Sequence, residues 1–344
     1  MTKPKVGAPP VGPPIEPMLA KLQRELPPGE GWLYEPKWDG FRAIVFKDGE
    51  QVYIQSRDLK PFNRYFPELV PVLAESLPER CVADGEIVVP GPDGRLEFDM
   101  LQMRIHPAES RIRMLAKQTP SSFIAFDLLA EAGKDLRHTP FAQRRARLER
   151  ALGKAANPAK RKLGRTQVLI TPQTDDPEEA EAWFEGLSRL GVEGVVAKRP
   201  DQVYRPGDRA MVKVKHVKTA DCVVGGYRMS KSGRGIGSLL LGLYDEDGTL
   251  HFVGHTASFK ADERVKILEM LKPLEGESFG HGRTPGGPSR WTQQELPWIT
   301  VKPVLVCEVQ FDKLQGDRFR HATTFVRWRK DRDPKSCTFD QIKT

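Results

Sequence analysis

The sequence predicts an α+β protein with two domains, a larger one of strands and helices and a smaller β-barrel after it. A chain of 344 residues is long enough for two separate cores. Segments with strand-like and helix-like apolar spacing alternate as far as the basic run at 213–218, and beyond it short strands separated by turns dominate. We therefore expect a first domain over residues 17–217 and a barrel over residues 218–344. The Pro-rich residues 1–16 are expected to form a flexible arm.

Composition limits the kind of partner and the compartment. The net charge of +8 favours a polyanionic partner, although many ordinary enzymes are also basic. There is no run of eighteen apolar residues and no signal-peptide pattern, so we expect neither a membrane span nor secretion. The four cysteines are far apart in the sequence and include no Cys-x-x-Cys pair. This argues against a zinc site and a disulfide framework, and it fits a reducing cytoplasm.

The elements of the first domain are predicted from apolar spacing and helix caps. A helix at 177–190 is the best marked, with Asp176 as its N-cap, Pro177 at its first position and Gly191 after its end. Its apolar stripe, which includes Ala180 and Trp183, is expected to pack in the core. Further helices are expected at 67–77 and 141–152, and strands at 32–34, 41–46, 82–89, 123–129, 195–198 and 211–215.

The second domain is expected to hold five short strands and one helix. The strands are expected at 222–228, 238–245, 250–257, 303–312 and 324–329, the helix at 261–272, and a Gly/Pro/Ser-rich loop at about 276–290. Such a set fits a small OB-type barrel. It fits an SH3-like barrel as well, and composition alone does not separate the two.

Residues 35–42, with the sequence EPKWDGFR, lie between two predicted strands and combine a lysine, an acid and a glycine. A solvated lysine with its usual pKa of ~10.4 is almost wholly protonated and is a poor nucleophile. Burial beside other cations or a metal ion frees such an amine for covalent chemistry. Lys37 is therefore a candidate nucleophile, with Asp39 near enough to orient it and Gly40 allowing a ligand to approach. The alternative is a polar hairpin with a solvated Lys–Asp pair.

Two further segments carry carboxylates that suit metal or ribose binding. Residues 84–86 (DGE) end a strand with two acids, which can hold a ribose hydroxyl or a divalent cation. Residues 192–198 (VEGVVAK) separate Glu193 and Lys198 by five positions, so a regular strand would turn them to opposite faces unless the glycine kinks it. The 84–86 segment also fits an ordinary hairpin acid.

Two basic segments suit phosphate binding. Residues 211–215 (MVKVK) alternate apolar and basic, so Lys213 and Lys215 share one face. The alternative is a solvated edge strand, where lysines are common. Residues 327–332 (RWRKDR) are basic again, and alone they fit a DNA-binding strand.

Taken in order, these motifs resemble the nucleotidyltransferase superfamily of ATP-dependent DNA ligases and mRNA capping enzymes, whose first motif is Lys-x-Asp-Gly, here 37–40. The chain looks most similar to the small bacterial ATP-dependent DNA ligases, which include the mycobacterial ligase C type and the ligase module of the bacterial end-joining enzyme. The resemblance runs from about Pro17 to the C-terminus. It implies a nucleotidyltransferase (adenylation) domain with antiparallel sheets and helices, followed by an OB-fold barrel.

The resemblance implies a catalytic set within the adenylation domain. Lys37 would be the nucleophile, assisted by Asp39, Lys198 and Lys215, and Lys198 would approach the α-phosphate. The family has an aromatic residue where this chain has Met211. The residues implied to surround the nucleotide in this domain are Glu35, Lys37, Arg42, Arg57, Glu86, Phe126, Glu193, Lys198, Lys213 and Lys215.

Several of these residues have sharper implied roles. Glu86 and Glu193 would form the metal site, and Glu86 would also contact the ribose. Phe126 would stack on the base, which is worth ~1–3 kcal/mol per base, although alone it fits a core phenylalanine. Arg42 and Arg57 would contact the nucleotide and the 5′-phosphate of a nick, because the guanidinium fork binds phosphate oxygens bidentately.

The last implied motif lies on the barrel. Arg329, Asp331 and Arg332 resemble the Arg-x-Asp-Lys element of ligases and capping enzymes, with Arg332 in place of the usual lysine. Carried on a mobile domain, such a group can orient the β- and γ-phosphates of ATP and then move away.

The resemblance implies a three-step reaction. Lys37 attacks the α-phosphate of ATP, the AMP moves to the 5′-phosphate at a nick, and the 3′-hydroxyl then displaces AMP. Mg²⁺ or Mn²⁺ would neutralise the developing charge. Lys198 and Lys215 would stabilise the same charge and help to keep Lys37 deprotonated.

The implied partner is nicked duplex DNA, held mostly through its backbone, since joining requires geometry and not sequence. We expect a monomer that is associated with the bacterial nucleoid in the cytoplasm and acts in DNA repair. Any repair polymerase or end-joining partner would lie on a separate chain. Three alternatives remain: a capping guanylyltransferase that uses GTP, an RNA ligase, and a non-catalytic nucleic-acid-binding protein.

Overall fold

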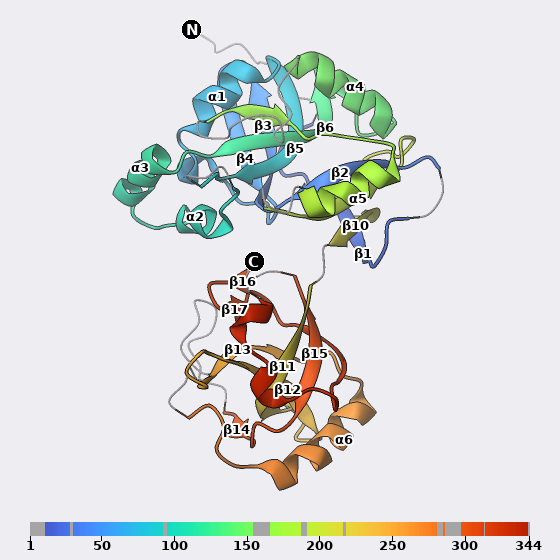
Figure 1. Ribbon diagram of the computed structural model, residues 1–344. Helices are drawn as coiled ribbons and strands as arrows, with labels where there is room; N and C mark the ends of the chain where they lie inside the picture. The colour runs from blue at the N-terminus through green and yellow to red at the C-terminus, as the bar shows by residue number, and fades with distance from the viewer. Residues whose placement is uncertain are drawn as a thin grey trace. The chain divides into compact units, whose positions relative to one another are not determined.

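The computed structural model describes residues 11–27, 30–91, 95–153, 166–186, 191–215, 218–280, 285, 297–312 and 314–342. The chain forms two compact units, Met1–His216 and Val217–Thr344 (Figure 1). Each unit has its own sheets and its own hydrophobic core. None of the described helices is long and apolar enough to cross a membrane.

The larger sheet of the N-terminal unit has the strand order β4-β3-β5-β6-β7, and neighbouring strands are antiparallel. Its central strands β5 and β6 are buried along almost their whole length, which indicates that both faces of the sheet are covered. The strands are β3 (Phe41–Asp48), β4 (Gln51–Ser56), β5 (Arg80–Val88), β6 (Ser122–Glu131) and β7 (Lys134–Asp135), and β8 (Val168–Ile170) pairs with β6 in parallel.

The smaller sheet of this unit has the order β1-β10-β9-β2. Its strands are β1 (Leu19–Gln23), β2 (Leu33–Trp38), β9 (Val192–Lys198) and β10 (Arg209–Lys215), and only the β1–β10 pair is parallel. The consecutive strands β2 and β3 therefore belong to different sheets. Asp39 and Gly40 form the crossing between the sheets, and the alternative of a polar hairpin at 35–42 is wrong.

Alternate side chains of β3 enter two different cores, as the period of two in a strand requires. Val45 packs in a cluster with Leu73 and Leu148 from the helices, whereas Ile44 packs in a cluster with Met211 of β10. The larger sheet thus has helices on one face and the smaller sheet on the other. Figure 1 shows α1 and α4 over the larger sheet and α5 against the smaller one.

The helices of the N-terminal unit follow the apolar spacing of the sequence. The helix expected at 141–152 is α4 (Phe141–Leu152), and the helix expected at 67–77 is α1 (Leu69–Ser76). The helix α5 (Pro177–Gly186) begins where expected, and Asp176 Oδ1 accepts a hydrogen bond from the amide of Glu178 at 2.8 Å. Residues 187–190 of that prediction lie outside the described residues. The remaining elements are η1 (Asn63–Tyr65), α2 (Phe98–Met103) and α3 (Glu109–Gln118).

The N-terminal segment differs from the flexible arm expected over residues 1–16. From Val11 onward the chain is fixed to the larger sheet, because Val11 and Ile15 are only 2% and 3% exposed. The side chain of Gln55 holds both the amide and the carbonyl of Ile15, at 3.0 and 2.7 Å. The prediction of a flexible arm is therefore wrong for residues 11–16. Two apolar side chains in this segment are buried, although its Pro-rich composition is typical of an extended, mobile chain. Residues 1–10 lie outside the described residues.

The C-terminal unit contains a curved antiparallel sheet with the order β13-β12-β11-β15-β18. These are the five expected strands, and α6 (Ala261–Leu271) follows the third of them. A parallel bridge between Thr256 and Thr323 links the end of β13 to the approach to β18, which brings the two outer strands together. This closure fits the partly open, five-stranded OB barrel. The strands are β11 (Lys218–Met229), β12 (Ile236–Tyr244), β13 (Leu250–Thr256), β15 (Val306–Phe311) and β18 (Thr324–Trp328).

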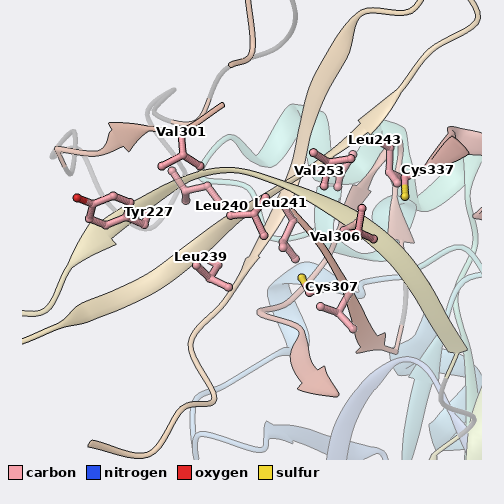
Figure 2. Packing of buried hydrophobic residues seen from close by; sticks show 14 of the residues in the cluster. Tyr227, Leu239, Leu240, Leu241, Leu243, Val253, Val301, Val306, Cys307 and Cys337 are labelled. Atoms are coloured by element: carbon pink, nitrogen blue, oxygen red, sulfur yellow. The ribbon is translucent and has the colours of Figure 1, made fainter. Parts of the chain in front are cut away.

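The barrel core is formed by side chains from facing strands. Figure 2 shows Leu241, Val253 and Val306 converging on it, and all three are buried. Cys307 and Cys337 also lie in this core, and all four cysteines of the chain are free and buried. The shorter elements are η4 (Lys272–Leu274), β14 (Ile299–Thr300), β16 (Leu314–Gln315), β17 (Arg318–Phe319), η5 (Pro334–Ser336) and η6 (Phe339–Gln341). The loop expected at about 276–290 lies mostly outside the described residues.

Candidate active site

Lys37 lies near the end of β2, where the chain leaves the smaller sheet for the larger one. Its Nζ donates to Glu193 Oε2 of β9 at 2.5 Å. The register pairs Lys37 with Gly194, and an irregularity follows between Lys37 and Trp38. The Lys37 side chain is 23% exposed, so a ligand can reach it while its position stays defined.

Two glycines allow the strands around Lys37 to approach closely. A Cβ atom on Gly194 would lie 2.0 Å from the carbonyl oxygen of Val214 on β10. A Cβ atom on Gly40 would lie 2.3 Å from the carbonyl oxygen of Ile87 and 2.8 Å from Cγ of Glu86. Only glycine fits at either point. The sheet crossing is thereby held against Glu86.

The carboxylates of this site have opposite electrostatic environments. Burial alone would raise the pKa of Glu193, but the charges of Lys37 and Lys215 lower it to about 2. Burial raises the pKa of Glu86 to about 8. The negative charges of Asp39 and Glu193 also act to raise this pKa, whereas the positive charge of Lys37 acts to lower it. Asp39 is itself buried, at 4% exposure. The site therefore holds one permanently ionised carboxylate beside another that resists ionisation.

The alternating strand β10 gives the site a positive side. Val212 and Val214 are buried, whereas Lys213 and Lys215 are partly exposed on the other face, as the sequence predicts. The Nζ of Lys215 lies 3.5 Å from the same Glu193 oxygen that Lys37 contacts. Burial and the charges of Lys37, Lys215 and Arg57 lower the pKa of Lys213. The cations are therefore close enough to repel one another, and a bound polyphosphate would relieve that repulsion.

Arg42 is held at the start of β3 by a buried carboxylate. Its Nε and Nη2 donate to the two oxygens of Asp84 at 3.0 and 2.7 Å. Burial opposes the charge of this guanidinium, but Asp84 raises the pKa of Arg42 above its usual value. The guanidinium carbon lies 5.2 Å from the ring centre of Phe126, which is partly buried on β6. The structure thus brings Arg42 and Phe126 together.

Lys198 occupies a different part of the site from Lys215. It is 3% exposed, and its Nζ contacts Glu35 Oε2 at 2.6 Å. The same Nζ lies 4.8 Å from the ring centre of Phe126. Lys37 therefore pairs with Glu193 and Lys198 pairs with Glu35, which is consistent with the opposite faces expected for positions 193 and 198 of one strand.

Three residues of the site, Arg145, Gln173 and Tyr204, were not predicted from the sequence. Glu35 also accepts hydrogen bonds from Arg145 at 3.2 Å and Gln173 at 2.9 Å. Tyr204 donates to Asp84 at 2.7 Å. Arg145 could have been found, because it lies four positions after Phe141 on the buried face of α4. Gln173 and Tyr204 lie in loops, where periodicity predicts nothing.

The C-terminal motif forms a separate ionic cluster within its own unit. Arg329 Nη2 contacts Asp331 at 2.8 Å, and Arg329 Nη1 contacts Asp221 at 2.9 Å. Arg332 Nε lies 3.6 Å from the same Asp221. The hydrogen bond from Arg329 lowers the pKa of Asp331 to about 2. The structure brings Arg329 and Arg332 together on Asp221, for which the sequence carries no signal.

The carboxylates around Lys37 suit a magnesium ion that is shared with a bound nucleotide. Mg²⁺ is commonly held by one or two carboxylates together with substrate phosphates, and not by an all-protein cage. Within the described part of the chain, no group of three or more His, Cys, Asp or Glu side chains could hold a metal ion. Burial, together with the negative charges of Asp39 and Glu193, keeps the pKa of Glu86 raised, and a bound cation would offset the repulsion between these carboxylates. Glu86 and Glu193 thus fit a cation whose remaining ligands are phosphate oxygens of a bound nucleotide.

A lysine held among carboxylates and other cations, on two packed sheets with a separate OB barrel, is the arrangement of a nucleotidyltransferase. The model of the ATP dependent DNA ligase domain matches residues 17–215, and that of the ATP dependent DNA ligase C terminal region matches residues 232–332. The chain therefore belongs to the family of ATP-dependent DNA ligases. This membership favours a ligase over a capping guanylyltransferase.

Individual relatives agree with this assignment. DNA ligase C1 of Mycolicibacterium smegmatis is 49% identical, and DNA ligase C of Mycobacterium tuberculosis is 47% identical; each match covers 97% of this chain and 95% of the relative. The multifunctional non-homologous end joining protein LigD of M. smegmatis is 31% identical over 90% of this chain and 37% of that protein. A solved structure from a study of Lig E DNA ligases has a TM-score of 0.54 at 17% identity, covers 91% of this chain and 99% of that chain, and shows the shared fold.

Proposed function

We propose that this DNA ligase seals nicks in duplex DNA through an AMP linked to Lys37 and then through a DNA adenylate. The observation that carries the proposal is the contact of 2.5 Å between Lys37 Nζ and Glu193, beside the cations of β10. This arrangement orients one amine toward a region where burial and positive charge favour phosphate.

The reaction has three displacements at phosphorus. In the first, the neutral amine nitrogen Nζ of Lys37 forms a bond to the α-phosphorus of ATP and gives up one proton to solvent, while the bond to the bridging oxygen breaks and pyrophosphate leaves. In the second, an oxygen of the 5′-phosphate at the nick attacks the same phosphorus, and the P–N bond breaks as the nitrogen of Lys37 takes a proton back from solvent. In the third, the 3′-hydroxyl attacks the 5′-phosphorus, its proton is lost, a phosphodiester bond forms and AMP leaves.

Glu193 is proposed to orient the amine and not to deprotonate it. A carboxylate whose pKa is about 2 is a weak base at neutral pH, but it is a strong hydrogen-bond acceptor for Lys37. Asp39 is proposed to assist this orientation from the sheet crossing. When Mg²⁺ or Mn²⁺ is bound, Glu86 and Glu193 would hold it, and it would supply neutralisation of charge on the phosphates.

The surrounding residues are proposed to bind ATP and the nick. Lys213 and Lys215 would contact phosphate oxygens, as would Arg42 and Arg57. Phe126 would stack on the adenine.

Lys198 is proposed to act beside the base, since its contacts are with Glu35 and the ring of Phe126. Glu35 would be held by Lys198 at the edge of the nucleotide. The role beside the α-phosphate would then fall to Lys215, whose Nζ lies near Lys37 through Glu193.

The two domains are proposed to have different roles: residues 17–217 form the adenylation domain, and residues 218–344 form the OB domain. Arg329, Asp331 and Arg332 would orient the departing pyrophosphate from the OB domain. A net charge of +8 favours backbone binding of duplex DNA. We propose a monomer that acts in DNA repair in the bacterial cytoplasm at the nucleoid, with any repair polymerase or end-joining partner on separate chains.

Labelling with each α-labelled nucleotide tests this proposal. The wild-type protein should take up label from ATP and not from GTP, and Lys37→Ala should take up none. Lys134→Ala, which removes an exposed lysine on β7, should be labelled normally. Lys37→Ala should still close a nick that already carries 5′-AMP, because that step needs no lysine nucleophile. Labelling of Lys37→Ala by ATP would exclude the proposed nucleophile.

The nature of the nick is tested separately. Sealing should be faster on a nicked DNA duplex than on the matching RNA duplex. A faster reaction on RNA would assign the chain to RNA joining.

A further inference from the structure

A chain of hydrogen bonds leads to Arg42 from Tyr204, a residue that belongs to none of the motifs. The amide of Met18 donates to the hydroxyl oxygen of Tyr204 at 3.0 Å. That hydroxyl donates to Asp84 Oδ2 at 2.7 Å. The same carboxylate accepts from Nε and Nη2 of Arg42. Four residues from β3, β5 and two loops are thus connected in series.

The direction of this chain is determined by its first member. A tyrosine hydroxyl has one proton to donate, and its oxygen can also accept. Because that oxygen accepts from Met18, the proton is directed at Asp84. Met18, Tyr204 and Asp84 are 1%, 4% and 0% exposed, so bulk water does not compete for these bonds.

The chain fixes the plane of the Arg42 guanidinium. Asp84 occupies the edge formed by Nε and Nη2, and Phe126 lies 5.2 Å from the guanidinium carbon. Among the described residues, none accepts a hydrogen bond from Nη1 of Arg42. The planar fork therefore has one edge fully engaged and Nη1 left for a phosphate oxygen. A change in the position of Asp84 would rotate that donor.

We infer that Tyr204 is a positioning residue for phosphate binding by Arg42, and that it acts through Asp84. The inference rests on the proposed function, in which Arg42 contacts phosphate. It adds a loop residue and the fixed N-terminal segment to the machinery of the reaction. Tyr204 itself touches neither nucleotide nor DNA in this scheme.

The test is a double-mutant cycle on the second-order rate constant of self-adenylylation. Tyr204→Phe removes only the hydroxyl, and we expect about a tenfold loss of that rate constant, as for one hydrogen bond to a charged group. In an Arg42→Ala background the same change should have no further effect, because the group that it positions is gone. Tyr227→Phe is the matched control, since Tyr227 is a buried tyrosine of the barrel that donates to Glu275 at 2.7 Å. This control should leave the rate constant unchanged.

Each outcome decides the inference. A tenfold loss that persists in the Arg42→Ala background, or no loss in either background, would overturn it. If Tyr204→Phe does not fold, Asp84→Asn replaces it in the same cycle, since the amide still accepts from Tyr204 but lacks the charge that pairs with Arg42. The loss should again vanish in the Arg42→Ala background, and its persistence there would overturn the inference. A wild-type protein that takes up no AMP would instead refute the proposed function.

Discussion

The substitution Glu86→Gln should stabilise the protein in the absence of divalent cations. The pKa of Glu86 is about 8 in the folded protein against an ordinary value of 4.5, owing first to burial. Between these pH values the folded state keeps a proton that the unfolded state releases. The free energy of unfolding must therefore fall as the pH rises from 4.5 to 8. Glutamine has the same shape and no ionisation, so it should remove this loss.

The size of the effect follows from the pKa. A rise from 4.5 to about 8 corresponds to at most about 5 kcal/mol at pH 8. Glu86 is only partly buried, so solvent screening should reduce this to about half. We therefore expect Glu86→Gln to be more stable than the wild type by about 2–3 kcal/mol at pH 8, and equally stable near pH 4.5.

Amide hydrogen exchange of peptides from β5, followed by mass spectrometry, measures the free energy of unfolding of the N-terminal unit alone. The control is Glu75→Gln, an exposed residue of α1 that should change stability by no more than ~0.5 kcal/mol at any pH. Added Mg²⁺ should narrow the gap between wild type and Glu86→Gln, because it favours the ionised carboxylate. A wild type that is equal to or more stable than Glu86→Gln at pH 8 would refute the reasoning, and a gap unaffected by Mg²⁺ would remove Glu86 from the metal site.

Three further changes test other parts of the site. Glu193→Ala should reduce the rate of self-adenylylation far more than DNA affinity, measured by single-turnover labelling and a gel-shift titration; the reverse result would make Glu193 structural. Gly194→Ala should lower the free energy of unfolding, measured by chemical denaturation, by at least ~2 kcal/mol, because its Cβ would lie 2.0 Å from a carbonyl oxygen of β10. The control Gly186→Ala on α5 places its Cβ in open space and should leave that free energy unchanged or raise it. Asp331→Ala should slow the ATP step and spare closure of a pre-adenylylated nick in rapid-quench assays; equal slowing of both steps would mean that the OB domain only holds DNA.

The positions of most elements could be predicted from local pattern, because apolar spacing and caps act over a few residues. The helix α4 and the alternation of β10 are examples. The N-terminal segment was predicted wrongly, because two buried side chains, Val11 and Ile15, outweigh a Pro-rich composition. The backbone of Ile15 is held by Gln55, 40 positions away, and no local pattern encodes such a contact.

The sequence predicted which residues belong to the site better than it predicted which of them contact one another. Lys37, Glu86 and Glu193 were expected together, and their charges do act on one another. The pairing of Lys198 with Glu35 depends on the register of β2 against β9, which the sequence does not reveal. The link from Tyr204 to Asp84 spans 120 positions, so only the folded chain shows it.

Mass spectrometry of the purified protein, before and after incubation with pyrophosphate, tests the central claim most directly. The protein as isolated, or after addition of ATP, should carry an excess mass of one AMP on the peptide that contains Lys37. Pyrophosphate should remove that excess by reversing the first step, and Lys37→Ala should never show it. An AMP adduct on another residue, or none after treatment with ATP and a divalent cation, would contradict the assignment of Lys37 as the nucleophile.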